Sequence, residues 1–335
     1  MGEFSKINFF NFNNQIKIIG VNVMRLPVFN IGEFENSAGA SREKYCTDLD
    51  KFCTKTGFLL VENHGVPDNV IESQWTAVEQ FFSQKPEDKK RVSVPYPGYP
   101  YGWIGPNKEA LAASKGEKTP PDLKESFNGG PIKTPTKKIK DNRAYEFCYQ
   151  PTIWPEIEGF QEAWTEYYME MEKLAAKIMS AFAEALKLEP TFFKNYIEFP
   201  ISALRALHYP KNTFVPEEGQ QRAGAHTDYG SLTILLPQPD TSGLQLKIEN
   251  DWIDVPATNG TFVINIGDLM ELWTGGRWKS TLHRVIAKPN QPGRKSLAFF
   301  HQPDWEAKIY PIGESNNDPV ISGPYLMEKF LSTGT

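Results

Sequence analysis

The chain contains His226-Thr227-Asp228 and, 55 positions after that aspartate (283 − 228 = 55), a further histidine, His283. Two imidazoles and one carboxylate are the ligand set that holds a non-haem Fe(II) ion on one face and leaves the opposite coordination positions open. His226 and Asp228 are two residues apart, so on a strand both side chains point to the same side. We therefore expect a metal site at His226, Asp228 and His283. Zinc accepts the same ligand types, so these residues alone do not choose between the two metals.

A pair of polar residues follows eleven positions after His283 (294 − 283 = 11), at Arg294 and Ser296. Alternate residues of a strand share a face, so this guanidinium and this hydroxyl point to the same side. Together they form a binding site for a carboxylate, which we call the carboxylate seat. A metal site and a carboxylate seat in one protein indicate a cosubstrate that is both a chelator and an acid.

The order of these motifs resembles that of the Fe(II)/2-oxoglutarate-dependent dioxygenases of the isopenicillin-N-synthase-like group. The matching stretches are 57–66, 123–127, 226–233, 243–246, 264–268, 279–285 and 294–296. The resemblance extends from about residue 24 to about residue 309. It implies a mainly β protein with flanking helices, whose core is a double-stranded β-helix (a jelly roll) with an N-terminal helical region. It also implies Fe(II), O2 and 2-oxoglutarate as cosubstrate.

The resemblance further implies how the cosubstrate binds. 2-Oxoglutarate would chelate the iron through its C1 carboxylate and 2-keto oxygen, and its remote carboxylate would reach Arg294 and Ser296. Tyr209, which precedes Pro210 as in the family, would add a hydroxyl. Plant members often carry an asparagine two positions before this tyrosine, where this chain has Leu207. The reaction would release succinate and CO2 and oxidise a small molecule, by hydroxylation, desaturation or oxidative cyclisation, in specialised metabolism.

The sequence specifies substrate contacts less sharply than iron ligands. We expect Tyr229, Trp273, Phe300 and Tyr101 to contact the substrate. On its strand Phe300 alternates with Ser296, so the two share the side that faces the carboxylate seat. Tyr101 belongs to a stretch rich in proline and glycine that is too long for a structureless linker, and we interpret it as a functional loop region.

Hydrophobic periodicity predicts helices in the first part of the chain and strands in the second. Helices are expected at 41–56, 68–83 and about 155–188. After residue 200, short apolar runs between turns are typical of a sandwich or barrel; they lie at 204–209, 231–236, 244–248, 261–266, 281–286 and 296–301. We divide the chain into an extension without a catalytic role (1–23), a helical and loop region (24–153), scaffold helices (154–199), a jelly-roll catalytic core (200–310) and a C-terminal segment (311–335).

Composition excludes several other classes of protein. The net charge of the 335 residues is −5 and no basic block stands out, so we expect no nucleic-acid partner. No apolar run reaches the length of a membrane span, and we expect no membrane partner. Three cysteines are too few for a disulfide framework and favour a reducing compartment, which we interpret as the cytoplasm. The expected partner is a small-molecule substrate, and the default assembly is a monomer.

Two other functions stay open at this point. One is an iron oxidase of the same fold that uses no 2-oxoglutarate, as in isopenicillin N synthase, where an Arg–Ser pair binds the substrate's own carboxylate. That synthase carries a glutamine near its C-terminus, whereas here no glutamine follows Gln302. The other is a non-catalytic sensor of a carboxylate metabolite, against which the complete set of iron ligands argues. The sequence names neither the substrate nor the type of oxidation.

Overall fold

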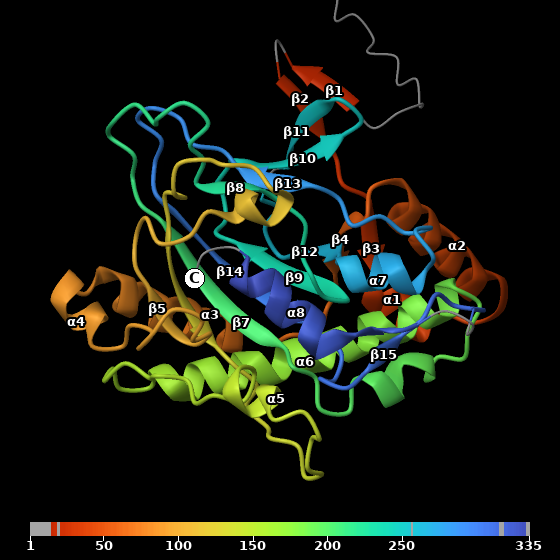
Figure 1. Ribbon diagram of the computed structural model, residues 1–335. Coiled ribbons are helices and arrows are strands. Elements are labelled where there is room, and N and C mark those ends of the chain that lie inside the picture. Colours follow the sequence, from red (N-terminus) through yellow and green to blue (C-terminus); the bar gives the residue numbers. More distant parts are fainter. Residues whose placement is uncertain (1–14, 19–20, 256, 315–317, 333–335) are drawn as a thin grey trace, which may run out of the picture.

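Two β-sheets face each other in the centre of the molecule, and most of the helices pack against the outer face of the larger sheet (Figure 1). The computed structural model describes residues 15–18, 21–255, 257–314 and 318–332. In this described part of the chain, the larger sheet has eight strands and the smaller sheet has six. The expectation of a mainly β protein with flanking helices is therefore confirmed.

The larger sheet brings together strands from both halves of the chain. Its order is β3 (Val28–Asn30), β4 (Phe58–Glu62), β12 (Phe262–Ile266), β9 (Leu232–Pro237), β14 (Arg294–His301), β7 (Ala203–Tyr209), β6 (Glu125–Gly129) and β5 (Gly102–Ile104). All neighbours are antiparallel except β3 and β4. In the pairing of β14 with β7, Arg294 lies beside Tyr209 and Ser296 beside Leu207. This register places the predicted carboxylate seat on two adjacent strands.

The smaller sheet carries two of the three predicted metal ligands. Its order is β1 (Gln15–Ile18), β2 (Val21–Met24), β11 (Asp251–Val255), β10 (Leu244–Ile248), β13 (His283–Val285) and β8 (Ala223–His226). Within it His283 pairs directly with His226. Part of the expected N-terminal extension thus forms a hairpin that lengthens this sheet, while residues 1–14 and 19–20 lie outside the described residues.

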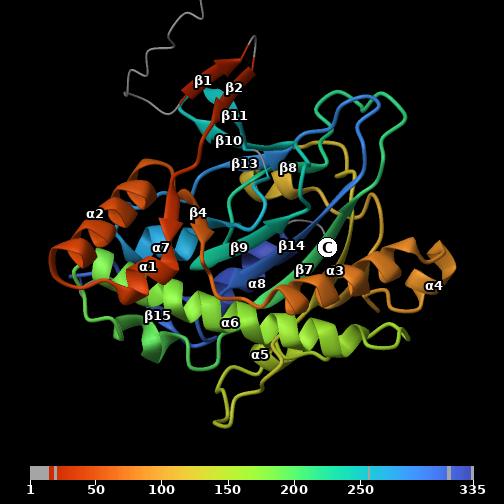
Figure 2. The same cartoon turned by 180° about the vertical axis from the view of Figure 1, so that it is seen from behind.

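Helices cover the back of the larger sheet, as Figure 2 shows from behind. The main ones are α1 (Ile31–Asn36), α2 (Gly39–Lys55), α3 (Asp68–Ser83) and α6 (Phe160–Ala185). The described chain also contains α4 (Pro86–Lys90), α5 (Arg143–Glu146), α7 (Asp268–Trp273) and α8 (Ser322–Leu331), with 3-10 turns at Leu111–Lys115 and Phe192–Tyr196. Of these, α8 lies on the cavity side of the larger sheet. A two-stranded sheet of β15 (Lys308–Ile309) and β16 (Val320–Ile321) precedes α8. The α6 ring of Tyr168 packs edge-on against Phe299 of β14 at 5.1 Å, so the stripe of large residues on α6 is core.

The predicted helices agree with α2 and α3, but the third begins later than expected. The sequence predicts a start near Pro155, whereas α6 begins at Phe160. Gly159, its N-cap, has a φ of +76°, a left-handed conformation that the interior of a right-handed helix does not accommodate. The turn at Gly159 therefore sets the start of the helix.

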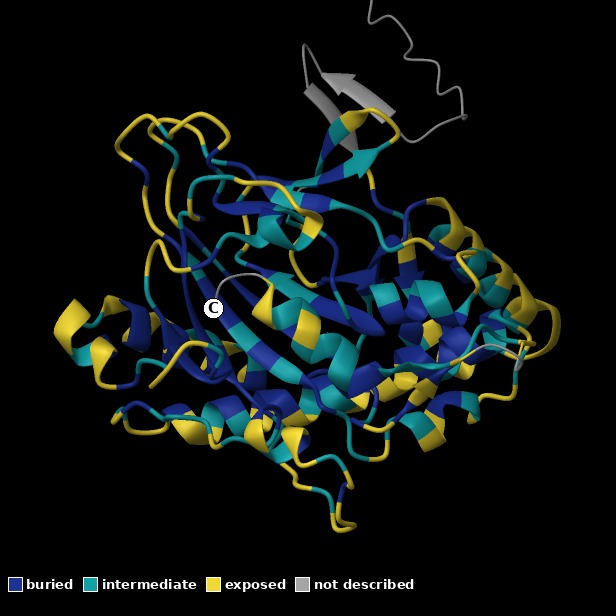
Figure 3. Cartoon of the chain, viewed as in Figure 1, coloured by how far each residue is buried: buried dark blue, intermediate teal, exposed yellow. Residues whose placement is uncertain are grey.

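Three strands of the two sheets between residues 102 and 255 were not predicted. β5 and β6 lie in the region interpreted as loop, and β11 lies between two predicted strands. The sequence of β6, Glu-Ser-Phe-Asn-Gly, has a single large apolar residue, yet all five residues are buried. Figure 3 shows that burial is concentrated on the strands in the centre of the molecule, while the exposed residues lie mainly on the outer helices and loops. The polar side chains of β6 face ion pairs and a cavity rather than solvent, so hydrophobic periodicity could not reveal this strand.

Gly57 joins the end of α2 to β4 at a point where two segments nearly touch. Its φ is +64°, and a Cβ atom there would lie 1.8 Å from the carbonyl oxygen of Lys279. Gly57→Ala is expected to lower the free energy of unfolding by about 3 kcal/mol or more, because backbone strain and overpacking add. Denaturant unfolding of the purified variant measures the difference.

Gly116 is the matched control for this substitution. Its φ is +77°, but no atom lies within 4 Å of the position of a Cβ. Gly116→Ala should therefore cost only the strain, about 1 kcal/mol. Equal losses of stability in the two variants would contradict the close approach of Gly57 to Lys279.

Candidate active site

A cavity of about 1340 Å³, counted out to its open mouth, lies between the two sheets. Every second residue of β7 and β14 lines it: Ala203, Arg205, Leu207 and Tyr209 from β7, and Arg294, Ser296, Ala298 and Phe300 from β14. The prediction that Phe300 and Ser296 share a strand face is thus confirmed. His226, His283 and Val285 of the smaller sheet line the cavity from the other side.

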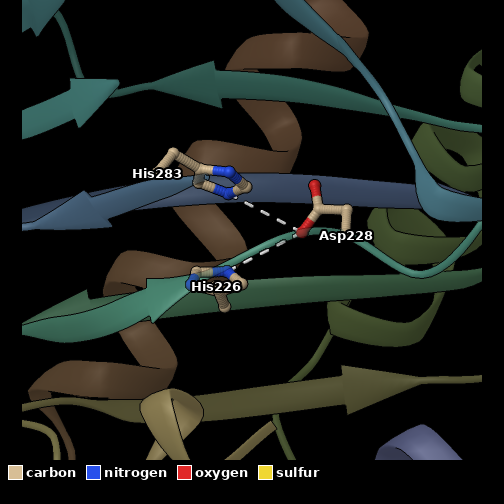
Figure 4. Close-up of side chains that lie close together, drawn as sticks. All are labelled: His226, Asp228 and His283. Atoms are coloured by element: carbon tan, nitrogen blue, oxygen red, sulfur yellow. Dashed lines mark ion pairs between the residues drawn. The ribbon is translucent and has the colours of Figure 1, made fainter. Parts of the chain in front are cut away.

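The three predicted metal ligands converge in this cavity (Figure 4). One ligand atom from each of His226, Asp228 and His283 can be chosen so that all three lie within 4.8 Å of one another. Oδ1 of Asp228 lies 3.7 Å from the Nε2 atoms of both histidines. One detail differs from the prediction: β8 ends at His226, so Asp228 lies in the turn after the strand and not on it.

Hydrogen bonds fix the orientation of both imidazoles. Nδ1 of His226 lies 2.7 Å from the carbonyl oxygen of Gly224, and Nδ1 of His283 lies 3.0 Å from that of Thr281. A proton on each Nδ1 donates to these carbonyls and leaves each Nε2 lone pair directed into the cluster. Burial and the neighbouring His283 lower the pKa of His226, which favours the neutral form that binds a metal.

Two neutral side chains hold the carboxylate of Asp228. Thr233 and Asn265 donate to its Oδ2 at 2.5 and 2.7 Å, so Oδ1 remains for the cluster. Burial by itself raises the pKa of Asp228, but the two histidines and the two hydrogen bonds outweigh it and lower the pKa. The main chain of Asp228 is also fixed, because its carbonyl oxygen accepts from the N–H of Asp268 at 2.8 Å.

This donor set fits Fe(II). Two imidazole nitrogens and one carboxylate oxygen, already oriented by outer hydrogen bonds, are the facial arrangement that non-haem iron takes in oxygenases. The cavity on the open side leaves room for further ligands. Among the described residues, this is the one group of at least three His, Cys, Asp or Glu side chains with metal-binding spacing.

A buried cation, Arg294, is the first residue of β14. Arg294 is 4% exposed, and its guanidinium carbon is 5.2 Å from the centre of the Tyr209 ring. Nη1 donates to the carbonyl oxygen of Ser242 at 3.3 Å, while Nε has no hydrogen-bond partner among the described atoms. Burial lowers the pKa of Arg294, but a guanidinium stays charged. Such a cation is stabilised by a bound anion, which is the chemistry expected for the remote carboxylate of 2-oxoglutarate.

Of the four expected substrate residues, Tyr101, Tyr229 and Phe300 line the cavity. Trp273 lies elsewhere: it is 1% exposed in the core, where its ring packs edge-on against Phe193 and Tyr196 at 5.0 and 5.3 Å. It is the last residue of α7, and that short helix turns its large apolar side chain away from the cavity. The structure therefore gives Trp273 a packing role, contrary to the prediction.

Several cavity residues were not found from the sequence. Leu326 and Phe330 of α8 reach the cavity next to Phe147, so the C-terminal helix covers part of its mouth. In the sequence, the spacing of these apolar residues is the same as in any amphipathic helix, so it does not indicate a role in the cavity. The signal for Asn265 was present in the motif at 264–268, which resembles the family, but the role of its amide required the three-dimensional arrangement.

Arg205, another unpredicted residue, belongs to a buried network of charges. Its Nη1 lies 3.1 Å from Glu109, and Lys124 bridges Glu109 at 3.3 Å and Asp122 at 2.6 Å. Asp122 in turn accepts from the backbone N–H of Gly224 at 2.9 Å, two residues before His226. Two cations and two anions balance, so this end of the cavity carries no net charge.

The network predicts a loss of stability in acid. Burial alone raises the pKa of Glu109, but Arg205 and Lys124 outweigh it and lower the pKa from 4.5 to about 2. A carboxyl whose pKa is lower in the folded state contributes stability above pH 4.5 and loses it as the pH falls towards 2. We expect Glu109→Gln to be about 3 kcal/mol less stable at pH 7. The variant should also have a shallower decline between pH 4.5 and 2, measured by urea unfolding at each pH.

Glu117→Gln, an exposed change in the same segment, is the control and should follow the parent curve. A Glu109→Gln curve parallel to that of the parent would contradict the role of this network.

Comparison with known proteins assigns this geometry to a family. A model described as 2OG-Fe(II) oxygenase superfamily matches residues 200–303, and one described as non-haem dioxygenase in morphine synthesis N-terminal matches residues 26–157. The chain belongs to the 2OG-Fe(II) oxygenase superfamily. As in other members of this superfamily, the core formed by its two sheets is a double-stranded β-helix.

Relatives of the 2OG-Fe(II) oxygenase cover nearly all of the chain. Validamycin A dioxygenase of Streptomyces hygroscopicus subsp. limoneus is 32% identical over 294 residues, 86% of this chain and 79% of the relative. The 2-oxoglutarate-dependent dioxygenase traH of Penicillium crustosum is 32% identical over 311 residues, 91% of this chain and 92% of the relative. The crystal structure of a full-length Neurospora crassa protein in complex with alpha-KG and thymine is 26% identical, with a TM-score of 0.77 over 94% of this chain and 98% of that one.

The 2OG-Fe(II) oxygenase is thus an oxidoreductase that uses Fe(II), 2-oxoglutarate and O2 to oxidise a small molecule. Within the part of the chain that the structure describes, no helix combines the length and the apolar character needed to cross a bilayer. Cys46, Cys53 and Cys148 are free thiols.

Proposed function

We propose that His226, Asp228 and His283 hold the iron and that the remote carboxylate of 2-oxoglutarate binds Arg294, with Ser296 and Tyr209 beside it. One observation carries this proposal: the three ligands line the same cavity as a buried guanidinium that has no carboxylate partner among the described residues. When bound, iron with 2-oxoglutarate and O2 supplies the oxidation of a C–H bond, and the cosubstrate leaves as succinate and CO2. Leu207 lies beside Ser296 and offers no hydrogen bond, so an asparagine contact at this position is absent from the proposed seat.

The chain's own residues orient the reactants and exclude water. Hydrogen bonds from Thr233 and Asn265 keep one carboxylate oxygen of Asp228 directed at the metal position. Apolar side chains of α8, including Phe330, cover part of the cavity, which strengthens the electrostatic interactions inside it. The protein's contribution is positioning and a dry environment, while the bound metal carries out the redox chemistry.

We assign the substrate to the part of the cavity lined by Tyr101, Tyr229 and Phe300. Arg205 contributes a hydrogen-bond donor there, and its charge is balanced by Glu109. A neutral, compact molecule with a polar group suits a region with aromatic walls and no net charge. Thymine, present in the similar Neurospora crassa structure, is an uncharged ring of this kind, and uncharged heterocycles are the first class to test.

The test is oxygen consumption by the Fe(II)-loaded enzyme, with succinate measured in parallel. We expect consumption to require 2-oxoglutarate, to be slow without a substrate, and to rise when an uncharged heterocycle is added. Consumption that is independent of 2-oxoglutarate would favour an oxidase of the isopenicillin N synthase type. Acceleration by carboxylic acids alone would contradict a neutral substrate.

The remaining features of the proposal concern the setting of the enzyme. A monomer in the cytoplasm, without nucleic-acid or membrane partners, is consistent with the net charge of −5 and the three free thiols. We also propose that regions 24–153, 154–199 and 200–310 act as one catalytic unit. The pairing of β6 with β7 and of β4 with β12 supports this, because the N-terminal region completes the larger sheet. Residues 1–23 and 311–335 flank this unit, and α8 of the latter reaches the cavity.

A further inference from the structure

A second buried arginine lies behind the carboxylate seat. Arg222 directly precedes β8 and is 1% exposed. Among the described residues it forms no ion pair, and its Nε has no hydrogen-bond partner. A buried guanidinium without a counter-charge is costly, so its position needs an explanation.

The side chain of Arg222 ties together the ends of the two strands that form the seat. Its Nη2 donates to the carbonyl oxygens of Pro210, Pro292 and Gln291 at 2.9, 2.7 and 3.3 Å. Pro210 follows Tyr209 at the end of β7, and Pro292 comes two residues before Arg294 at the start of β14. One guanidinium therefore fixes both strand ends.

The same residue connects the seat to the metal ligands. The backbone N–H of Arg222 donates to the carbonyl oxygen of Val285 at 2.9 Å, where β8 runs beside β13. β8 ends at His226 and β13 begins at His283. The residue thus links the two strands that carry the histidines to the two strands that carry Tyr209 and Arg294.

Arg222 is also close enough to Arg294 for their charges to interact. The pKa of Arg222 is lowered to about 10, mainly by burial and secondly by the charge of Arg294. Both guanidiniums are therefore charged near neutral pH. Two neighbouring cations without a described carboxylate between them repel each other in the absence of a ligand. An anion bound at Arg294 would relieve this repulsion.

We propose that Arg222 is a positioning residue for the remote carboxylate of the 2-oxo acid cosubstrate: it fixes Tyr209 and Arg294 and adds positive charge behind them. This inference rests on the proposed binding of 2-oxoglutarate at Arg294. It predicts that Arg222 sets the preference of the enzyme for 2-oxo acids with a second carboxylate, without touching the cosubstrate.

The test compares two ligands of the Fe(II)-loaded enzyme under anaerobic conditions. 2-Oxoglutarate has the remote carboxylate, whereas pyruvate has only the 2-oxo acid group that chelates the metal. Binding of each is followed through the visible charge-transfer band. In Arg222→Met, 2-oxoglutarate should bind roughly tenfold more weakly, the size expected for one lost charge-assisted interaction, while pyruvate binding changes less than about twofold. Arg222→Lys, which keeps a charge and three donors, should recover part of the loss.

The controls separate this inference from the proposed function and from a folding defect. Arg277→Met removes a half-exposed arginine that pairs with Asp50 on the surface and should bind both ligands as the parent does. Should Arg222→Met fail to fold, Arg222→Gln, which keeps a donor without the charge, takes its place and should also lose affinity for 2-oxoglutarate alone. Unchanged affinity for 2-oxoglutarate, or an equal loss for both ligands, would overturn the role of Arg222. If Arg294→Met also retains full affinity, the proposed cosubstrate seat itself is wrong.

Discussion

Replacing Asp228 with alanine is expected to lower Fe(II)-dependent turnover roughly a thousandfold or more. A bound metal ion lowers the activation free energy by several kcal/mol, and the variant loses one of the ligands that hold it. The variant loses the carboxylate that both imidazoles face at 3.7 Å. Iron retained after anaerobic loading and desalting should fall in parallel with the rate of succinate formation. The circular dichroism spectrum should stay that of the parent, since Thr233 and Asn265 are neutral and leave no buried charge unpaired.

Two further variants test whether the loss of iron binding is specific to the cluster. Asn265→Ala removes one outer hydrogen bond to Asp228, at 2.7 Å, and should weaken iron binding about 10- to 100-fold. His64→Ala removes a histidine whose Nδ1 accepts from the backbone N–H of Val66, and iron binding should stay at the parent level. If His64→Ala lost as much iron as Asp228→Ala, the assignment of the metal site would be wrong.

Arg294→Met is expected to raise the KM for 2-oxoglutarate about a hundredfold, with a smaller change in kcat. This size corresponds to two charge-assisted hydrogen bonds of about 1.5 kcal/mol each. Steady-state succinate formation at varied 2-oxoglutarate measures it. Lys295→Met is the matched control, because Lys295 is the next residue on the strand, points to the other face and pairs with Glu79 at 2.6 Å.

The outcome for Arg294 also separates two functions that the sequence leaves open. Dependence of the KM for 2-oxoglutarate on Arg294 supports binding of the cosubstrate there. An unchanged KM for 2-oxoglutarate combined with weaker binding of the prime substrate would instead assign Arg294 to the substrate's own carboxylate, as in isopenicillin N synthase.

The sequence predicts the alternating face of β14 because this face depends on local spacing. Arg294, Ser296 and Phe300 follow the period of a strand. Such periodicity survives folding, since a strand sends alternate residues to one side. The metal cluster is predicted instead from the ligand types of His226, Asp228 and His283. Asp228 lies in the turn after β8, and the direct pairing of His283 with His226 depends on the fold, so no local pattern gives this geometry.

Other parts of the site depend on contacts between distant segments. β6 has little apolar character, and its Glu125 is buried through bonds to Lys89 and His208, which lie 36 and 83 positions away along the chain. The position of Trp273 has a similar origin. The sequence shows an aromatic residue but not the direction of α7, which places its ring in the core against Phe193. Arg222 carried no signal, because its partners are backbone carbonyls.

The most direct test of the central claim is an anaerobic titration of the Fe(II)-loaded protein with 2-oxoglutarate, followed through the visible metal-to-ligand charge-transfer band. The account predicts a band that saturates at one 2-oxoglutarate per iron in the parent, is absent in Asp228→Ala, and in Arg294→Met needs about a hundredfold more 2-oxoglutarate. Absence of the band in the parent, with iron bound, would contradict the account.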